Sequence, residues 1–310
     1  MLPVKIPRNT DNILLEIGDR RVQLTNLRKP FWPDLEITKG DLLQYYADVA
    51  PYLLPHLRDR AMVMKRYPNG AYGEFFFMKR APSPRPDWIQ LCTIVHSSGN
   101  VIHFPMIQDL AALLWVINLG CIDLNQWYAR CDDVDRPDYL HLDLDPGEGA
   151  TFAMVRETAL IVREALEVLK MKPLVKTTGS RGMHVYVPIV RGPTQKEVWT
   201  IAKTLAIELA SRHRRVMTAV YAVAKRPKDR VLADYNQNAW GRTLASLYSV
   251  RPRARAPVST PVSWKEVERG VDIEDWRFDN VRARLAKVGD LWKPLLGKTG
   301  RTNLGRYIGP

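Results

Sequence analysis

The 310-residue sequence has few cysteines and no long apolar run. No apolar stretch approaches the 18 residues of a membrane-spanning helix, and the first eight residues lack a signal-peptide core, so we expect a cytoplasmic protein. The three cysteines, Cys92, Cys121 and Cys131, show no Cys-x-x-Cys spacing, which argues against a zinc site and a disulfide framework and predicts reduced thiols. Internal repeats and coiled-coil heptads are also missing, and the lack of heptads favours a monomer.

The chain also has fewer acidic than basic residues. The chain has 46 Lys and Arg residues against 33 Asp and Glu residues, a formal net charge of +13. Such an excess favours a polyanionic partner, nucleic acid first and an anionic membrane second. Basic chains that bind neither also exist, so the kind of partner has to be inferred from the sequence motifs.

Apolar periodicity and turn residues predict an α+β chain. We expect a hairpin at 13–24, a helix from the Thr38 cap to Pro51 and a buried helix at 107–119. The second half predicts strands at 139–145, 174–178, 183–190 and 231–234, with helices at 152–170 and 194–212. No linker separates 1–130 from 131–296, so we predict one domain, 1–296, of two consecutive modules, followed by a mobile basic tail at 297–310.

The stretch His141-Leu-Asp-Leu-Asp-Pro-Gly147 places two carboxylates on one face of a predicted strand. Side chains alternate along a strand, so Asp143 and Asp145 point one way and the leucines point the other. Carboxylates about 4 Å apart repel by roughly 4 kcal/mol at an effective dielectric of 20, and a divalent cation between them reverses the sign. Oxygen ligands suit Mg²⁺ or Mn²⁺, and Asp234, at the end of another short apolar run, is a candidate third ligand. Solvated Asp-x-Asp pairs are common, so this pair alone leaves both interpretations open.

A glycine-rich turn, Thr178 to Gly182, joins the predicted strands 174–178 and 183–190. Gly179 and Gly182 allow a positive φ or a close backbone approach. Thr178, Ser180 and Arg181 add hydroxyls and a guanidinium fork that suit phosphate oxygens. The alternative is an ordinary hairpin turn with a hydrogen-bonded His184.

Together these motifs resemble the archaeo-eukaryotic primase superfamily. Within it the chain is similar to the polymerase domain of bacterial ligase D and to stand-alone bacterial primase-polymerases. The resemblance covers about residues 20–295, and its specific pieces are His141–Gly147, Gly179–His184, Asp234–Asn238 and Arg242–Arg251. It implies a primase-polymerase fold of mixed and antiparallel sheets, in which an RRM-like catalytic module flanked by helices (131–296) follows an N-terminal α/β module (1–130).

The resemblance implies a template-directed nucleotidyl transferase that extends primer 3′-OH ends at gaps or double-strand breaks in bacterial DNA repair and favours ribonucleotides. Asp143, Asp145 and Asp234 are then expected to hold two Mn²⁺ or Mg²⁺ ions. The implied contacts of the incoming NTP or dNTP are Lys65, Thr178, Ser180, Arg181, His184, Gln237 and Arg251.

Two further sites follow from the same resemblance. Asn26, Lys29 and Lys39 match a pocket for a DNA 5′-phosphate, and Lys39 lies in the first turn of a helix, where free amides and the helix dipole favour an anion. Phe76 and Phe77 match aromatics that stack on template bases. Core packing is an equal alternative for these two, and Phe75 is expected in the core.

The chain departs from ligase D polymerase domains at several positions. Asn125 stands where a histidine is usual, Arg181 replaces a common Lys, and Thr178 replaces a common Ser. No Lys-x-Asp-Gly ligase motif is present, so end joining implies a separate DNA ligase and an end-binding protein. A primase that starts chains de novo, a metal-dependent nuclease and a non-catalytic DNA-end-binding module are the alternatives. In each case we expect a cytoplasmic, nucleoid-associated protein.

Overall fold

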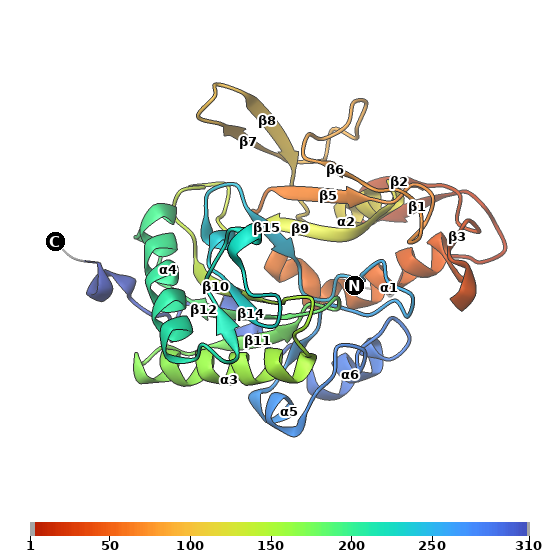
Figure 1. Ribbon diagram of the computed structural model, residues 1–310. Helices are drawn as coiled ribbons and strands as arrows, with labels where there is room; N and C mark the ends of the chain where they lie inside the picture. Colours follow the sequence, from red (N-terminus) through yellow and green to blue (C-terminus); the bar gives the residue numbers. More distant parts are fainter. Residues whose placement is uncertain (1–3, 309–310) are drawn as a thin grey trace. The chain divides into compact units, whose positions relative to one another are not determined.

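The computed structural model describes residues 4–308, which fall into two compact units (Figure 1). Unit 1 contains the chain up to Trp127 together with Ala245–Val258 and Arg277–Gly289. Unit 2 contains Tyr128–Leu244, Ser259–Trp276 and the chain from Asp290 onward. Each unit therefore combines stretches that are far apart in the chain, whereas the sequence analysis predicted two consecutive modules. The predicted α+β class, with antiparallel sheets and helices, is confirmed.

Unit 1 is built on a sheet of order β15–β9–β5–β6, in which only the last residue of β15 belongs to this unit. Three two-stranded sheets, β1–β2, β3–β4 and β7–β8, and the helices α1, α2 and α6 complete the unit. The predicted hairpin at 13–24 is confirmed as β1–β2. The elements are β1 (Ile13–Ile17), β2 (Arg20–Leu24), β3 (Pro30–Trp32), η1 (Pro33–Leu35), β4 (Ile37–Thr38), α1 (Lys39–Leu57), β5 (Met62–Arg66), β6 (Phe76–Met78), β7 (Leu91–Val95), β8 (Val101–Pro105), α2 (Leu110–Asn118), β9 (Cys121–Trp127), β15 (Thr243–Ala245) and α6 (Val281–Val288).

Helix α1 begins as predicted and ends later than predicted. Thr38 forms a capping box, accepting from the Asp41 amide while the Asp41 side chain accepts from the Thr38 amide. Pro51 does not end the helix, which continues through Pro55 to Leu57. Proline interrupts only one backbone hydrogen bond, and the burial of Leu53 and Leu57, both 0% exposed, stabilises the last turns.

Unit 2 is a six-stranded sheet of order β13–β14–β10–β12–β11–β16 with α3 and α4 against one face (Figure 1). Leu140, Leu142 and Leu144 of β10 point into this core, which side chains of α3 and α4 complete. Alternation turns the intervening side chains of β10 to the opposite face. The elements are β10 (Tyr139–Pro146), α3 (Phe152–Val168), β11 (Leu174–Thr177), β12 (Met183–Pro188), α4 (Gln195–Arg212), β13 (Met217–Thr218), η2 (Val223–Lys225), β14 (Val231–Asp234), η3 (Asn236–Asn238), β16 (Pro261–Val262), α5 (Trp264–Arg269), α7 (Lys293–Leu296) and η4 (Leu304–Tyr307).

The described part of the C-terminal segment is packed within unit 2 and does not form the expected mobile tail. Thr302 pairs with Ile189, Leu304 is 0% exposed in the core, and the Tyr307 hydroxyl donates to Leu169 O at 2.7 Å. Residues 309–310 of the expected tail lie outside the described part.

The cysteines differ from the prediction of three reduced thiols. Cys121 is a free, buried thiol whose pKa is raised by burial. Cys92 and Cys131 are disulfide-bonded, so the prediction is wrong for these two. As to membranes, no helix within residues 4–308 has both the length and the apolar character needed to span a bilayer.

Candidate active site

Four polar side chains form a row across four adjacent strands of unit 2. Asp143 on β10 lies directly opposite Asp234 on β14 and opposite His184 on β12, and His184 in turn lies opposite Lys176 on β11. Opposite residues in antiparallel strands share a face, with Cβ atoms about 4.5–5.5 Å apart. Asp145, two residues beyond Asp143, lies on the same face. The register therefore places the three carboxylates that the sequence singled out at neighbouring positions on one face of the sheet.

Two of the carboxylates are buried, Asp145 is half-buried, and the three interact electrostatically. Asp143 and Asp234 are 6% and 5% exposed. The charge of Asp143, followed by burial, raises the pKa of Asp145 to about 7, and Asp234 adds to the rise. Asp234 is held in place because its oxygens accept from the Asn236 amide at 2.8 Å and from Gln237 Nε2 at 2.9 Å. His184 Nε2 lies 3.2 Å from Asp143 Oδ1.

This donor set fits a divalent cation in its chemistry and its register. Among the described residues, no three His, Cys, Asp or Glu side chains are gathered closely enough to form a preassembled metal cluster. Asp143, Asp145 and Asp234 nevertheless supply hard oxygen ligands at neighbouring positions of one sheet face. Their mutual repulsion, seen in the raised pKa of Asp145, is what a bound dication offsets.

The turn between β11 and β12 is organised by one hydroxyl. Thr178 Oγ1 accepts from the amides of Ser180, Arg181 and Gly182 at 3.1–3.3 Å. Thr178 is itself only 5% exposed, so its hydroxyl shapes the turn. Ser180 is half-buried and Arg181 is exposed, which leaves these two side chains to present polar groups to a ligand.

Glycine is required in this turn for a close backbone approach. Gly179 has a φ of +63°, a conformation that glycine adopts without strain. A Cβ on Gly182 would lie 2.1 Å from Leu144 O and 3.6 Å from Asp145 Cα. The turn therefore packs directly on the strand that carries the carboxylates.

Two buried residues near the carboxylates were missed by sequence reasoning. Lys176 is 1% exposed, and its ammonium group donates to Ser259 Oγ at 2.5 Å. Asn238 is 0% exposed and exchanges hydrogen bonds with the backbone of His141, which ties the turn after β14 to β10. The sequence did contain a signal that Lys176 belongs to the site. Side chains alternate along a strand, with Val175 and Thr177 on either side of Lys176, so a Val175 that faces the core places Lys176 on the opposite, polar face.

His141 shares the face of Asp143 but packs as an aromatic ring. It is 1% exposed and stacks on Tyr186 with ring centroids 5.1 Å apart. Burial, followed by the nearby His184, lowers the pKa of His141 to about 3, so the ring is neutral near pH 7.

Lys65 and Arg251, two of the predicted nucleotide contacts, belong to unit 1 and flank one buried carboxylate. Asp123 is 1% exposed, with Lys65 Nζ at 3.8 Å and Arg251 Nε at 3.4 Å. Lys65 Nζ also lies 3.9 Å from the ring centroid of Phe75. Asn125, at the position of the usual histidine, donates to the Asp123 carbonyl at 3.0 Å.

The three consecutive phenylalanines are all exposed. Phe75, Phe76 and Phe77 have exposed fractions of 49%, 42% and 58%. The expectation that Phe75 is a core residue is therefore wrong: its ring packs on Tyr67 and under Lys65 at the surface. Exposed rings on Phe76 and Phe77 suit base stacking.

The residues predicted to bind a 5′-phosphate gather around the start of α1. Lys39 is 5% exposed and its ammonium group donates to Thr25 O at 2.6 Å, while Lys29 Nζ donates to Asn69 Oδ1 at 3.3 Å. Burial, followed by the charge of Lys29, lowers the pKa of Lys39 to about 8. Asn26 has a φ of +56°, which asparagine tolerates better than most residues.

The argument from free helix amides is wrong at this site. The amides of Lys39, Gly40 and Asp41 donate to Lys29 O, Leu27 O and Thr38 Oγ1. The positive charge at this site therefore comes from the two ammonium groups and the helix dipole.

Comparison with known proteins identifies the group to which this arrangement belongs. The model of the family described as LigD, primase-polymerase domain, matches residues 38–292. The chain is 32% identical over 277 residues to the multifunctional non-homologous end joining protein LigD of Mycolicibacterium smegmatis, an alignment that covers 89% of this chain and 36% of that protein. The LigD protein of Pseudomonas aeruginosa is 29% identical over 288 residues, covering 90% of this chain and 33% of that protein.

A solved structure agrees with the sequence comparison. The polymerase domain from Mycobacterium tuberculosis ligase D in complex with DNA matches with a TM-score of 0.84 at 29% identity, covering 90% of this chain and 99% of that chain. The chain thus spans nearly all of a ligase D polymerase domain but only about a third of the curated relatives' length.

Proposed function

Since this chain belongs to the LigD primase-polymerase family and is a nucleotidyltransferase, we propose that it is a template-directed polymerase that extends primer 3′-OH ends at gaps or broken ends during bacterial non-homologous end joining. The single observation that carries the proposal is the register that sets Asp143 opposite Asp234, with Asp145 on the same face. Ribonucleotide preference, a separate ligase, an end-binding protein and an association with the nucleoid are parts of the proposal.

Asp143, Asp145 and Asp234 are the proposed ligands of two Mn²⁺ or Mg²⁺ ions. When bound, such ions lower the pKa of the attacking 3′-hydroxyl and stabilise in-line transfer at the α-phosphate. The chain's own side chains bind and orient the reactants. Gln237 holds the Asp234 carboxylate, and His184 contacts Asp143.

The triphosphate is the proposed ligand of the glycine-rich turn. Ser180 and Arg181 reach it from a turn whose shape Thr178 sets, and the guanidinium of Arg181 suits two phosphate oxygens at once. Lys65 and Arg251, which are oriented by Asp123, are the proposed contacts from unit 1.

A non-catalytic DNA-binding module is disfavoured by the same carboxylates. Three acidic groups on one face repel a polyanion unless cations neutralise them. A binding module has no use for such a cluster, whereas a metal-dependent transferase requires it.

The test is extension of a gapped duplex with one NTP or dNTP at a time, with and without Mn²⁺. We expect templated addition of one or a few nucleotides only when the metal is present, with ribonucleotides favoured. Strand shortening would instead indicate a nuclease, and synthesis on a primer-free template would indicate a primase. DNA binding without any addition would refute the polymerase assignment.

Asn26, Lys29 and Lys39 form the proposed site for a DNA 5′-phosphate, and its affinity is expected to fall as the pH rises from 7 to 9. The pKa of Lys39 is about 8, so its ammonium group loses its proton in this window, whereas an ordinary lysine stays charged. A protonated lysine attracts the phosphate and a neutral one does not. At pH 9 about a tenth of Lys39 is charged, so the preference for 5′-phosphate over 5′-hydroxyl DNA should drop by up to about tenfold.

Fluorescence anisotropy with the two DNAs at each pH measures this preference. The Lys39→Ala variant is the control and should show a small preference that does not change with pH. An equal decline on 5′-hydroxyl DNA, or an undiminished pH dependence in Lys39→Ala, would exclude Lys39 as the titrating group.

A further inference from the structure

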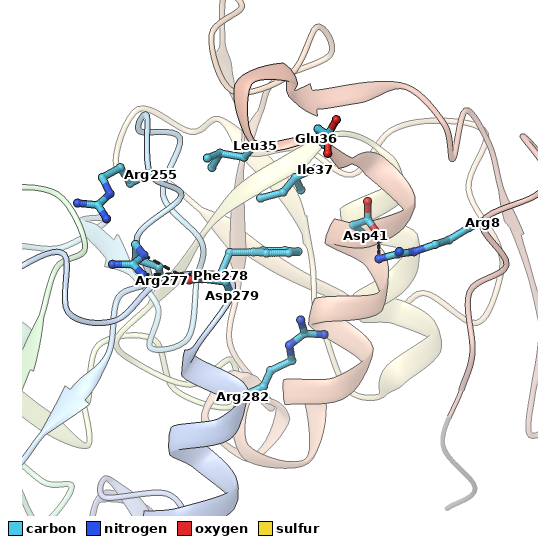
Figure 2. A pocket seen from close by; sticks show the side chains of 10 residues that line it. All are labelled: Arg8, Leu35, Glu36, Ile37, Asp41, Arg255, Arg277, Phe278, Asp279 and Arg282. Atoms are coloured by element: carbon cyan, nitrogen blue, oxygen red, sulfur yellow. Dashed lines mark hydrogen bonds and ion pairs between the residues drawn. The ribbon is translucent and has the colours of Figure 1, made fainter.

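A cavity of about 460 Å³ in unit 1 is lined by none of the residues proposed above for the nucleotide or the 5′-phosphate (Figure 2). Four arginines from three separate segments line it: Arg8, Arg255, Arg277 and Arg282. We call it the arginine pocket. Arginines gathered around a cavity are suited to phosphate, because the planar guanidinium can bind two oxygens at once.

The pocket has a fixed apolar floor. Phe278 and Ile37 are 8% and 9% exposed, and Phe278 stacks on Tyr45 with ring centroids 5.2 Å apart. The Phe278 amide donates to Ala256 O at 2.9 Å, next to Arg255 in the chain. The arginines at positions 255 and 277 therefore project from backbone segments that are bonded to each other.

Glu36, Asp41 and Asp279 also line the pocket, and the ion pairs that its arginines form differ in strength. Both carboxylate oxygens of Asp41 have partners: one caps α1 and the other lies 2.6 Å from Arg8. Arg282 pairs with Asp48 at 2.8 Å. Arg277 pairs with a more exposed carboxylate: Asp279, whose side chain is 66% exposed, lies 3.3 Å from both Nε and Nη2 (Figure 2).

An ion pair with so exposed a carboxylate is weak and exchanges readily. The Asp279 carboxylate occupies the fork of Arg277 in the way that two phosphate oxygens would. A phosphate that enters the pocket can replace it and gain the charge of Arg255 as well, because Arg255 lines the same cavity.

We propose that the arginine pocket binds a backbone phosphate of the DNA downstream of the gap, held by Arg277 and Arg255. The inference rests on the proposed function for its choice of DNA as the ligand. Ile37 lines the pocket, and Lys39 of the proposed 5′-phosphate site is only two residues further along the chain. Two residues span at most about 7 Å, and each DNA strand presents a phosphate about every 3.4 Å along the helix axis. A strand held at Lys39 thus brings its neighbouring phosphates to the pocket.

The test compares the wild type with an Arg255→Gln, Arg277→Gln double variant on two DNAs. One is a gapped duplex with a 12-base-pair downstream arm, and the other is the same primer–template without that arm. We expect the double variant to bind the gapped duplex about tenfold more weakly near 0.1 M salt, and the slope of log affinity against log salt to fall by about 1 to 2. Binding to the DNA without the arm should not change.

Two matched controls separate the pocket from general charge. An Arg163→Gln, Arg212→Gln pair removes equal charge from a partly exposed arginine on α3 and an exposed arginine on α4 of unit 2 and should have little effect. Asp279→Asn removes the competing carboxylate and should strengthen binding to the gapped duplex, more than Asp19→Asn, whose side chain is 96% exposed in unit 1.

The proposal is overturned by an equal loss on both DNAs, by a loss that the unit 2 pair reproduces, or by unchanged binding. The proposal would also be overturned if, in a parallel assay, the Arg255→Gln, Arg277→Gln double variant lost binding to an acidic peptide while its DNA binding stayed intact. Because the assay contains no nucleotide, it stays informative if extension fails. Conversely, extension with no effect of these variants refutes the pocket alone.

Discussion

Asp143→Asn is expected to abolish nucleotide addition while leaving DNA binding intact. Asp143 lies at the centre of the row, opposite Asp234 and two residues from Asp145, so its loss disrupts the proposed ligand set of both ions. Metal ions supply several kcal/mol of transition-state stabilisation, and each 1.36 kcal/mol is a factor of ten in rate. Single-nucleotide addition on a gapped duplex should therefore slow by at least about a thousandfold.

A stability measurement without nucleotide separates this loss from misfolding. The charge of Asp143 is the largest cause of the raised pKa of Asp145, so ionising Asp145 costs folding free energy as the pH rises from about 4 to about 7. Without metal, Asp143→Asn should therefore be at least as stable as the wild type at pH 7, and Mn²⁺ should stabilise only the wild type. Unchanged addition by the variant would remove Asp143 from the site.

Gly182→Ala is expected to have the second largest effect. The added Cβ would lie 2.1 Å from Leu144 O, a backbone atom that cannot move without displacing β10. Overpacking of this kind costs about 1–3 kcal/mol of stability, and a displacement of about 1 Å at a reacting centre costs about a hundredfold in rate. Thermal unfolding and single-nucleotide addition measure the two effects.

Gly192→Ala is the matched control, because a Cβ on Gly192 meets nothing within 4 Å. It should fold and react as the wild type does. If Gly182→Ala behaves like this control, the turn does not depend on its close contact with β10.

Alternation along single strands predicted part of the candidate site. The spacing of Asp143 and Asp145 placed them on one face, and the Thr38 capping box marked the start of α1. Both inferences are local, because they depend on the geometry of a few consecutive residues.

The partners of these elements depend on strand register between distant segments. That Asp234 joins Asp143 as a ligand was suggested by its place at the end of a short apolar run and implied by the family resemblance. Its register opposite Asp143 was not predicted, because β10 and β14 are separated in the chain by two α-helices and three other strands. The burial of Lys176 and the hydrogen bonds of Asn238 depend on the same sheet.

Tertiary contacts explain the predictions that were wrong. The helix did not end at Pro51 because Leu53 and Leu57 are buried beyond it. The amides at the start of α1 are taken by Leu27 and Lys29, from a loop whose path no local pattern specifies. The arginine pocket is assembled from four separate segments with no motif among them.

The most direct test of the central claim is anomalous diffraction from crystals grown with Mn²⁺ and a nucleoside triphosphate. We predict two manganese peaks coordinated by Asp143, Asp145 and Asp234, with the triphosphate against Ser180 and Arg181. Manganese bound elsewhere, or an Asp234 carboxylate that coordinates no ion, would contradict the account.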